Sequence, residues 1–87
     1  MSTRVAVVAI IVEEPSHVEE LNRILSENSK YIIGRMGIPY KQRGINIISV
    51  AVDAPQDVIS TMTGRIGKLP GVSSKTAYSQ IVTETDD

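Results

Sequence analysis

Basic side chains and glycines gather in one short stretch of this 87-residue chain. Arg35, Tyr40 and Arg43 can donate hydrogen bonds to a carboxylate or a phosphate, and a guanidinium can do so with two parallel bonds. Gly34 and Gly37 lie beside them, where glycine allows a bulge, an unusual backbone conformation or the close approach of a ligand to backbone amides. We therefore predict a ligand-binding site formed by Gly34, Arg35, Gly37, Tyr40 and Arg43. The alternative is a solvated hairpin whose charges protect an exposed sheet edge.

A second candidate site lies at Gly71, Val72 and Ser73. The backbone amides and hydroxyl groups that follow Pro70 could bind an anion. The alternative is a turn that only reverses the chain, because Pro and Gly are ordinary turn residues. If the first stretch is only architecture, we expect the ligand at this second turn.

Other kinds of site are disfavoured by the residues that the chain lacks. Without any Cys it cannot form disulfides, thiolate metal sites or iron–sulfur ligands. His17 is the single histidine, and the carboxylates around it suit the first turn of a helix better than a metal site. No nucleophile with an ordered His and Asp and no glycine-rich phosphate loop is visible. We expect no cofactor, no metal and no enzymatic activity.

The charge and the aromatic content of the chain disfavour nucleic acids and membranes as partners. The net charge is -1, and no block of Lys or Arg accumulates that could attract a nucleic acid or an anionic membrane. Phe and Trp are absent, so the stacking platform of RNA-recognition modules is missing. The apolar run over residues 5–12 is too short to cross a bilayer and is followed by no signal-peptide cleavage pattern. We expect a cytoplasmic protein with no direct contact with nucleic acid or membrane.

Four strands and two helices are expected to position these residues. The apolar segment over residues 5–12 is typical of a buried strand. Ser16 and Glu19 have capping-box spacing and predict the start of a helix over residues 16–28. The later segments show the same kinds of signal, which predict a strand over residues 31–39, a strand over 45–52, a helix from about 53 to 67 and a strand over 72–82.

The order β-α-β-β-α-β predicts an α+β, ferredoxin-like sandwich, in which one antiparallel sheet carries both helices on one face. We expect a single domain over residues 1–82, with its first and third strands at the centre of the sheet. The polar residues 83–87 are expected to form a frayed tail.

The first strand is apolar on both of its sides, which are represented by Val7 and Val8. Two helices can cover only one face of the sheet, and a large exposed apolar face usually marks an interface. Self-association into a dimer or tetramer, through the open face or through the edge of the second strand, would cover it with a single sequence. The sequence does not decide which set of side chains faces the helices.

The chain resembles a family of small ACT-like proteins named as regulators of iron-only hydrogenase systems. The resemblance covers nearly the whole chain and is carried by residues 31–40, 47–55 and 69–75, with Gly-Arg-Met-Gly-Ile-Pro-Tyr at 34–40 as its specific part. It implies an oligomer of ferredoxin-like subunits related to the ligand-sensing domain of nickel-responsive regulators. Those sensors bind nickel with several His and a Cys, so nickel binding is not carried over to this chain. No DNA-binding segment precedes Arg4, so direct DNA binding is not expected either.

These observations predict a regulatory ACT-like module that binds a small ligand or a partner protein and is linked to an iron-only hydrogenase system. The alternative is a structural or assembly partner in the maturation of a redox enzyme, with no ligand of its own. A small enzyme is the third and least supported reading.

Overall fold

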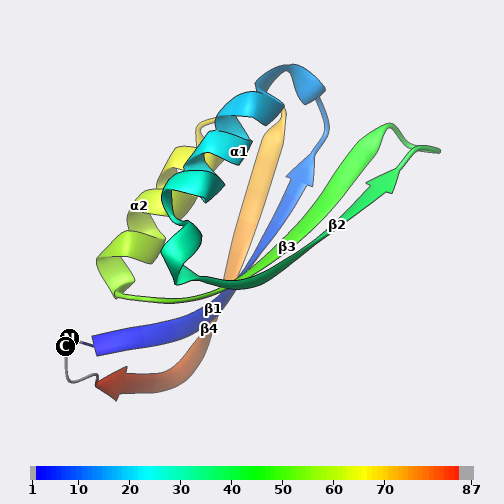
Figure 1. Ribbon diagram of the computed structural model, residues 1–87. Helices are drawn as coiled ribbons and strands as arrows, with labels where there is room; N and C mark the ends of the chain where they lie inside the picture. Colours follow the sequence, from blue (N-terminus) through cyan, green and yellow to red (C-terminus); the bar gives the residue numbers. More distant parts are fainter. Residues whose placement is uncertain (1, 85–87) are drawn as a thin grey trace.

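The computed structural model describes residues 2–84, which form one four-stranded antiparallel sheet and two α-helices (Figure 1). The strand order β2-β3-β1-β4 places β1 and β3 at the centre, as predicted, and confirms the ferredoxin-like, ACT-like fold. Two short 3-10 turns precede and follow α1. The elements are β1 (Ser2–Val12), η1 (Pro15–His17), α1 (Val18–Glu27), η2 (Ser29–Tyr31), β2 (Ile32–Tyr40), β3 (Ile45–Ala54), α2 (Gln56–Gly67) and β4 (Val72–Glu84).

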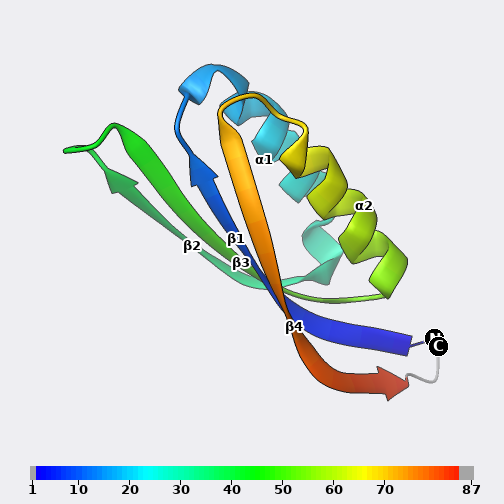
Figure 2. The ribbon, with the colours of Figure 1, turned by 180° about the vertical axis from the view of Figure 1, so that it is seen from behind.

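Both helices cover the same face of the sheet (Figures 1 and 2). The sheet is longer than the helices, and the overall extents are 45 × 19 × 17 Å. The paired ends of β1 and β4 project beyond the helices at one end of the molecule, and the β2–β3 hairpin projects at the other (Figure 2). Within residues 2–84, nothing covers the second face of the sheet.

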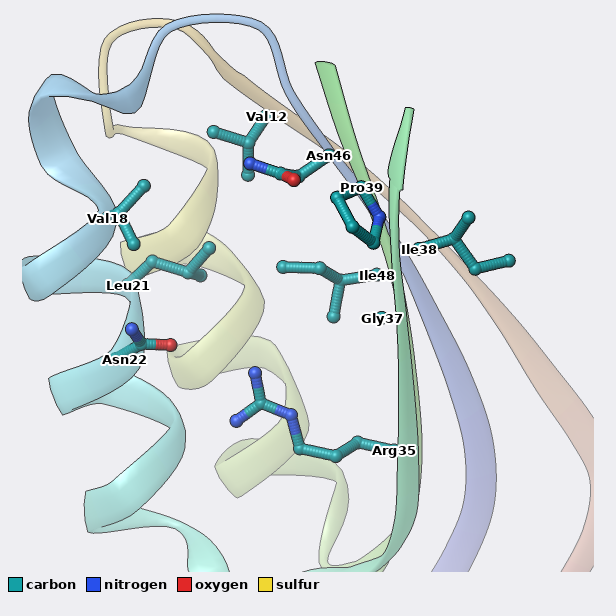
Figure 3. A pocket seen from close by; sticks show the side chains of 10 residues that line it. All are labelled: Val12, Val18, Leu21, Asn22, Arg35, Gly37, Ile38, Pro39, Asn46 and Ile48. Carbon is teal, nitrogen blue, oxygen red and sulfur yellow. The ribbon is translucent and has the colours of Figure 1, made fainter. Parts of the chain in front are cut away.

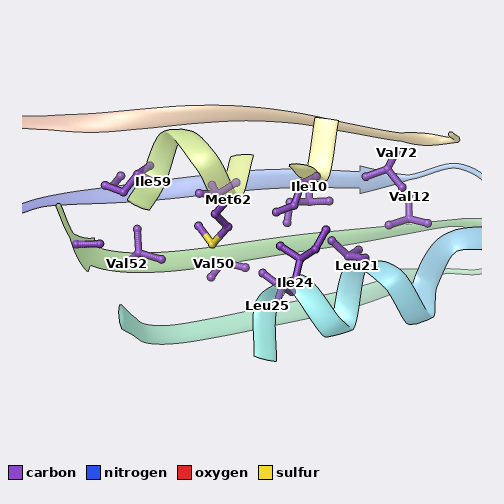
Figure 4. Packing of buried hydrophobic residues seen from close by; sticks show 14 residues of the cluster. Ile10, Val12, Leu21, Ile24, Leu25, Val50, Val52, Ile59, Met62 and Val72 are labelled. Atoms are coloured by element: carbon purple, nitrogen blue, oxygen red, sulfur yellow. The ribbon is translucent and has the colours of Figure 1, made fainter. Parts of the chain in front are cut away.

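Alternation along β1 decides which side chains face the helices. Val8 and Ile10 are 0% exposed and lie in the core, whereas Val7 is 41% exposed on the other side. The core is completed by apolar side chains of α1, α2 and β3, among them Leu21 and Ile59 (Figure 4). The side of β1 that carries Val8 therefore faces the helices, which the sequence alone did not decide.

The uncovered side of the sheet is called the open face below. It is formed by the side chains that alternate with the core residues along each strand. They are Val5, Val7, Ala9 and Ile11 of β1, Gly34, Met36, Ile38 and Tyr40 of β2, Ile45, Ile47, Ser49, Ala51 and Asp53 of β3, and Ser73, Lys75 and Ala77 of β4.

The start of α1 differs from the prediction. The capping box of Ser16 and Glu19 does not form, because Pro15 starts a separate 3-10 turn and α1 begins only at Val18. Neither turn nor helix has a side-chain cap hydrogen bond at its start, and the Ser16 hydroxyl lies 3.1 Å from Nδ1 of His17.

An ion pair connects the two helices on the surface. The Arg65 guanidinium donates to both carboxylate oxygens of Glu27, at 2.8 and 3.3 Å. This hydrogen bond holds the pKa of Glu27 below its ordinary value of 4.5. Both side chains are well exposed to solvent, so the pair contributes little to stability, and the apolar core sets the position of the helices.

The register of the sheet shifts in two places among the described residues. Between Ile32 and Gly34 the pairing of β2 with β3 slips by one residue, so the irregularity expected near Gly34 lies just before it, at Ile33. Gly37 pairs regularly with Ile48, and nothing lies within 4 Å of a Cβ added there. The expectation of a bulge or an unusual backbone at Gly37 was therefore wrong.

The second shift lies between β1 and β4, between Arg4 and Ala6. The Arg4 guanidinium donates two hydrogen bonds to the backbone carbonyl of Ser79, at 2.7 and 3.2 Å, and fixes this irregular segment. Beyond it, β4 continues to Glu84, two residues past the expected end at Val82. The rest of the expected tail, residues 85–87, lies outside the described residues.

Replacing Gly71 with Ala is expected to lower the free energy of unfolding by more than the roughly 1–2 kcal/mol that a left-handed backbone costs an ordinary residue. Gly71 has φ 75°, and a Cβ built on it would lie 2.5 Å from the Cβ of Glu14. Gly44→Ala is the matched control, since Gly44 has φ 65° and open space around it. Urea denaturation of both variants measures the difference, and equal losses would show that Glu14 does not restrict this turn.

Candidate ligand-binding site

A cavity of about 270 Å³ lies between α1 and the β2–β3 hairpin, on the helix-covered side of the sheet (Figure 3). We call it the α1 cavity. Its floor and walls are largely apolar and come from β1, α1, β2 and β3. The apolar side chains are Val12, Val18, Leu21, Pro39 and Ile48, and the polar ones are Asn22, Arg35 and Asn46.

Strand alternation explains why β2 contributes Arg35, Gly37 and Pro39 to this cavity. These residues are opposite Val50, Ile48 and Asn46 of β3, on the side that faces the helices. Gly37 has no side chain, and the space above it is open. The absence of a side chain at Gly37 therefore leaves room between Arg35 and Pro39, while the side chain of Ile38 points away from the cavity (Figure 3).

Three polar side chains line this apolar hollow. The Arg35 guanidinium extends from β2 towards α1, where Asn22 lies, and Asn46 lies on β3 beside Pro39 (Figure 3). Within residues 2–84, none of the three side chains makes a hydrogen bond or an ion pair. No acidic residue lines the cavity. The arrangement offers one positive charge and two carboxamides above an apolar floor, which suits a small organic anion.

Only Arg35 and Gly37 of the five residues predicted around the hairpin line this cavity. Gly34 and Tyr40 lie on the open face, because neighbouring residues of a strand point to opposite sides of a sheet. Gly34 there borders a shallow hollow beside Val7. Arg43 lies in the exposed turn that joins β2 to β3, where its backbone amide donates to the carbonyl of Tyr40.

The second predicted site is not brought together with Arg35. The carbonyl of Gly71 accepts hydrogen bonds from the backbone amides of Glu13 and Glu14, at 2.7 and 3.3 Å. Val72 belongs to the core, and Ser73 lies on the open face opposite Ile11. The three residues therefore serve chain reversal, core packing and the sheet surface, and none of them lines the α1 cavity.

Asn22 and Asn46 were not predicted as site residues. A weak signal existed for each, since Asn22 follows the core residue Leu21 and Asn46 interrupts the apolar segment of β3. An isolated carboxamide next to core positions is common on any helix or strand. Only the folded arrangement places both in the lining of the same cavity as Arg35.

Residues 2–84 contain neither a cluster of metal-ligating side chains nor a membrane-spanning helix. No three His, Asp or Glu side chains in this part of the chain are placed to share a metal ion. No helix in it is long and apolar enough to cross a membrane.

The sheet order and the two helices on one face define a small ACT-like domain with a cavity beneath its first helix. The chain belongs to the TM1266-like family, which is described as "Iron-only hydrogenase system regulator, putative" and whose profile matches residues 4–76. The resemblance noted in the sequence is thereby confirmed.

Two solved structures share this fold. TM1266 from Thermotoga maritima, described as an uncharacterized protein, matches with a TM-score of 0.84 at 26% identity, over 87% of this chain and 96% of that chain. A formyltetrahydrofolate deformylase from Pseudomonas putida KT2440 matches with a TM-score of 0.61 at 15% identity, over 84% of this chain and 28% of that chain. At that identity the second likeness shows the fold alone. No curated protein matches the sequence at a significant level.

Proposed function

We propose that this chain is a cytoplasmic regulatory module of an iron-only hydrogenase system, and that it responds to a small organic anion without catalysing a reaction. Residues 1–82 act as one domain in this proposal. The observation that carries it is the unpaired guanidinium of Arg35, which extends towards Asn22 of α1 over an apolar hollow whose other end is lined by Asn46 (Figure 3). Family membership supports the regulatory role.

The size and charge of the α1 cavity limit the ligand. Typical small-molecule pockets measure about 300–1,000 Å³, so a cavity of about 270 Å³ suits a ligand of few atoms. Arg35 is the only charged residue in its lining, which matches a single carboxylate better than a group of higher charge. The two carboxamides can donate to or accept from further polar atoms of the ligand, while its apolar part rests on Leu21 and Ile48.

A ligand in this position would connect two elements that are otherwise in loose contact. Arg35 belongs to β2, at the edge of the sheet, and Asn22 belongs to α1. An anion bound by both would fix the β2–β3 hairpin against the helix. We propose that a partner protein reads this change in the hairpin.

Replacing Arg35 with Ala is expected to abolish ligand-induced stabilisation. A panel of small monocarboxylates, dicarboxylates, inorganic phosphate, amino acids, nucleotides and metal ions is tested by thermal shift on the wild-type protein. A ligand that binds only the folded state raises the free energy of unfolding by roughly 2.7 kcal/mol when its concentration is one hundred times its Kd. We expect at least one monocarboxylate to raise the Tm of the wild type and to leave that of the Arg35→Ala variant unchanged.

Arg43→Ala is the matched control, because it removes the same charge from the neighbouring turn outside the cavity. Its response should equal that of the wild type. If Arg43→Ala loses the response and Arg35→Ala retains it, the α1 cavity is not the site. Gly37→Val adds an independent check, since its side chain would fill the open space beside Arg35 and should also remove the response.

A second candidate function is that of an assembly partner in the maturation of a redox enzyme, with no ligand of its own. The observation that favours it is the apolar open face, where Met36 and Ile38 are well exposed. No stabilisation by any compound of the panel, combined with stable self-association or binding of another protein through this face, would favour this second function.

A further inference from the structure

The open face carries charges at only two positions among the described residues. Asp53 lies on β3 opposite Val5, and Lys75 lies on β4 opposite Ala9. Both side chains are exposed, and within residues 2–84 neither has an ion-pair partner. The rest of the face is apolar or uncharged.

The two charges are arranged symmetrically about Val7. Val7 lies two residues from Val5 and two residues from Ala9 on β1, and β1 lies between β3 and β4. Asp53 and Lys75 therefore occupy diagonally opposite positions on the open face. Consider two copies whose open faces meet, related by a two-fold axis that lies between the sheets and passes over Val7. When this axis is perpendicular to the line from Asp53 to Lys75, it places Asp53 of one copy over Lys75 of the other. In such a pair each Asp53 meets a Lys75 of the other copy.

We infer that a second copy of this chain covers the open face, with Asp53 of each copy paired with Lys75 of the other. An isologous contact needs a surface that is complementary to itself. This face has apolar side chains at its centre, with the negative Asp53 on one side of them and the positive Lys75 on the other. The α1 cavity lies on the opposite side of the sheet, so this inference is independent of the proposed ligand.

The sheet edges offer a poorer contact than the face. Edge strand β2 contains the register shift at Ile33 and also Pro39, which lacks an amide hydrogen. Edge strand β4 is irregular beside Arg4. Bulges and prolines are features that prevent another strand from pairing with an edge. A face-to-face pair is therefore favoured over a continuous sheet across two copies.

The experiment uses charge reversal in the full-length chain. Asp53→Lys places two lysines opposite each other at both contacts of the pair, and Lys75→Asp places two aspartates there. The dimer Kd of each variant alone is expected to be about a hundredfold higher than that of the wild type, because like charges facing each other in an apolar contact repel. Light scattering at micromolar concentration should give a dimer mass for the wild type and a monomer mass for each variant.

Mixing the two variants restores both charge pairs in a mixed dimer. We expect a dimer mass for the equimolar mixture, and also for a chain that carries both substitutions. Circular dichroism checks that each variant is folded. If either variant unfolds, the neutral variants Asp53→Asn and Lys75→Gln are used in place of the charge reversals. Each should raise the dimer Kd about tenfold or more. A monomeric wild type, single variants as dimeric as the wild type, or a mixture that stays monomeric would overturn the inference.

Discussion

Replacing Val8 with Asp is expected to unfold the protein. Val8 is 0% exposed and lies at the centre of β1, beneath both helices. An unpaired carboxylate in such a core costs several kcal/mol, and the whole folded state of a domain is stable by only about 5–15 kcal/mol. A chain of 87 residues belongs at the low end of that range, because small domains bury a smaller share of their surface.

Far-UV circular dichroism and the dispersion of amide NMR signals at 25 °C measure this outcome. Val8→Ala is a milder control at the same position, since it removes apolar contacts without adding a charge, and it should remain folded with a lower Tm. A Val8→Asp variant with the spectra and Tm of the wild type would contradict the assignment of this side of β1 to the core.

The same substitution one residue earlier should have a different effect. Val7 is 41% exposed at the centre of the open face, so Val7→Asp should leave the chain folded and split the dimer. A carboxylate buried between two copies costs several kcal/mol of binding free energy, which corresponds to roughly a hundredfold or greater increase in the dimer Kd. Light scattering across the micromolar range measures the change.

Thr61→Asp serves as the control for added charge, because Thr61 is exposed on α2, on the helix-covered side of the sheet. It should leave the dimer mass unchanged. A dimer of wild-type affinity in the Val7→Asp variant would place the contact elsewhere on the molecule.

The order of the elements could be predicted because the signals are local. The apolar run of β1, the turn residues before β3 and Gly67 at the end of α2 each favour one kind of structure within a few neighbouring residues. The boundaries were less accurate where a local preference was overridden. Pro15 introduced a 3-10 turn that displaced the expected start of α1.

The site was predicted less completely, because side chains close in sequence were treated as close in space. Arg35 and Gly37 share one side of β2, but Gly34 and Tyr40 share the other, because the strand alternates regularly from Gly34 to Tyr40. The other polar residues of the cavity come from α1 and β3 instead. No local pattern in a single sequence shows that Asn22 and Asn46 line one cavity with Arg35.

Two surfaces with different properties result from this fold. The helix-covered side holds the α1 cavity with its unpaired polar groups, and the open face is apolar with two opposite charges. Central strand β1 contributes Val12 to the first surface and Val7 to the second. We therefore expect variants of the open face to change self-association without removing the response to a ligand.

The central claim, that the α1 cavity binds a small organic anion, is tested most directly by NMR titration with the monocarboxylate that gives the largest thermal shift. The side-chain amide signals of Asn22 and Asn46 and the Nε signal of Arg35 report on the cavity itself. The proposal predicts that these three signals shift together and saturate with one Kd. Saturable shifts confined to other regions, or no saturable shift with any compound of the panel, would contradict it.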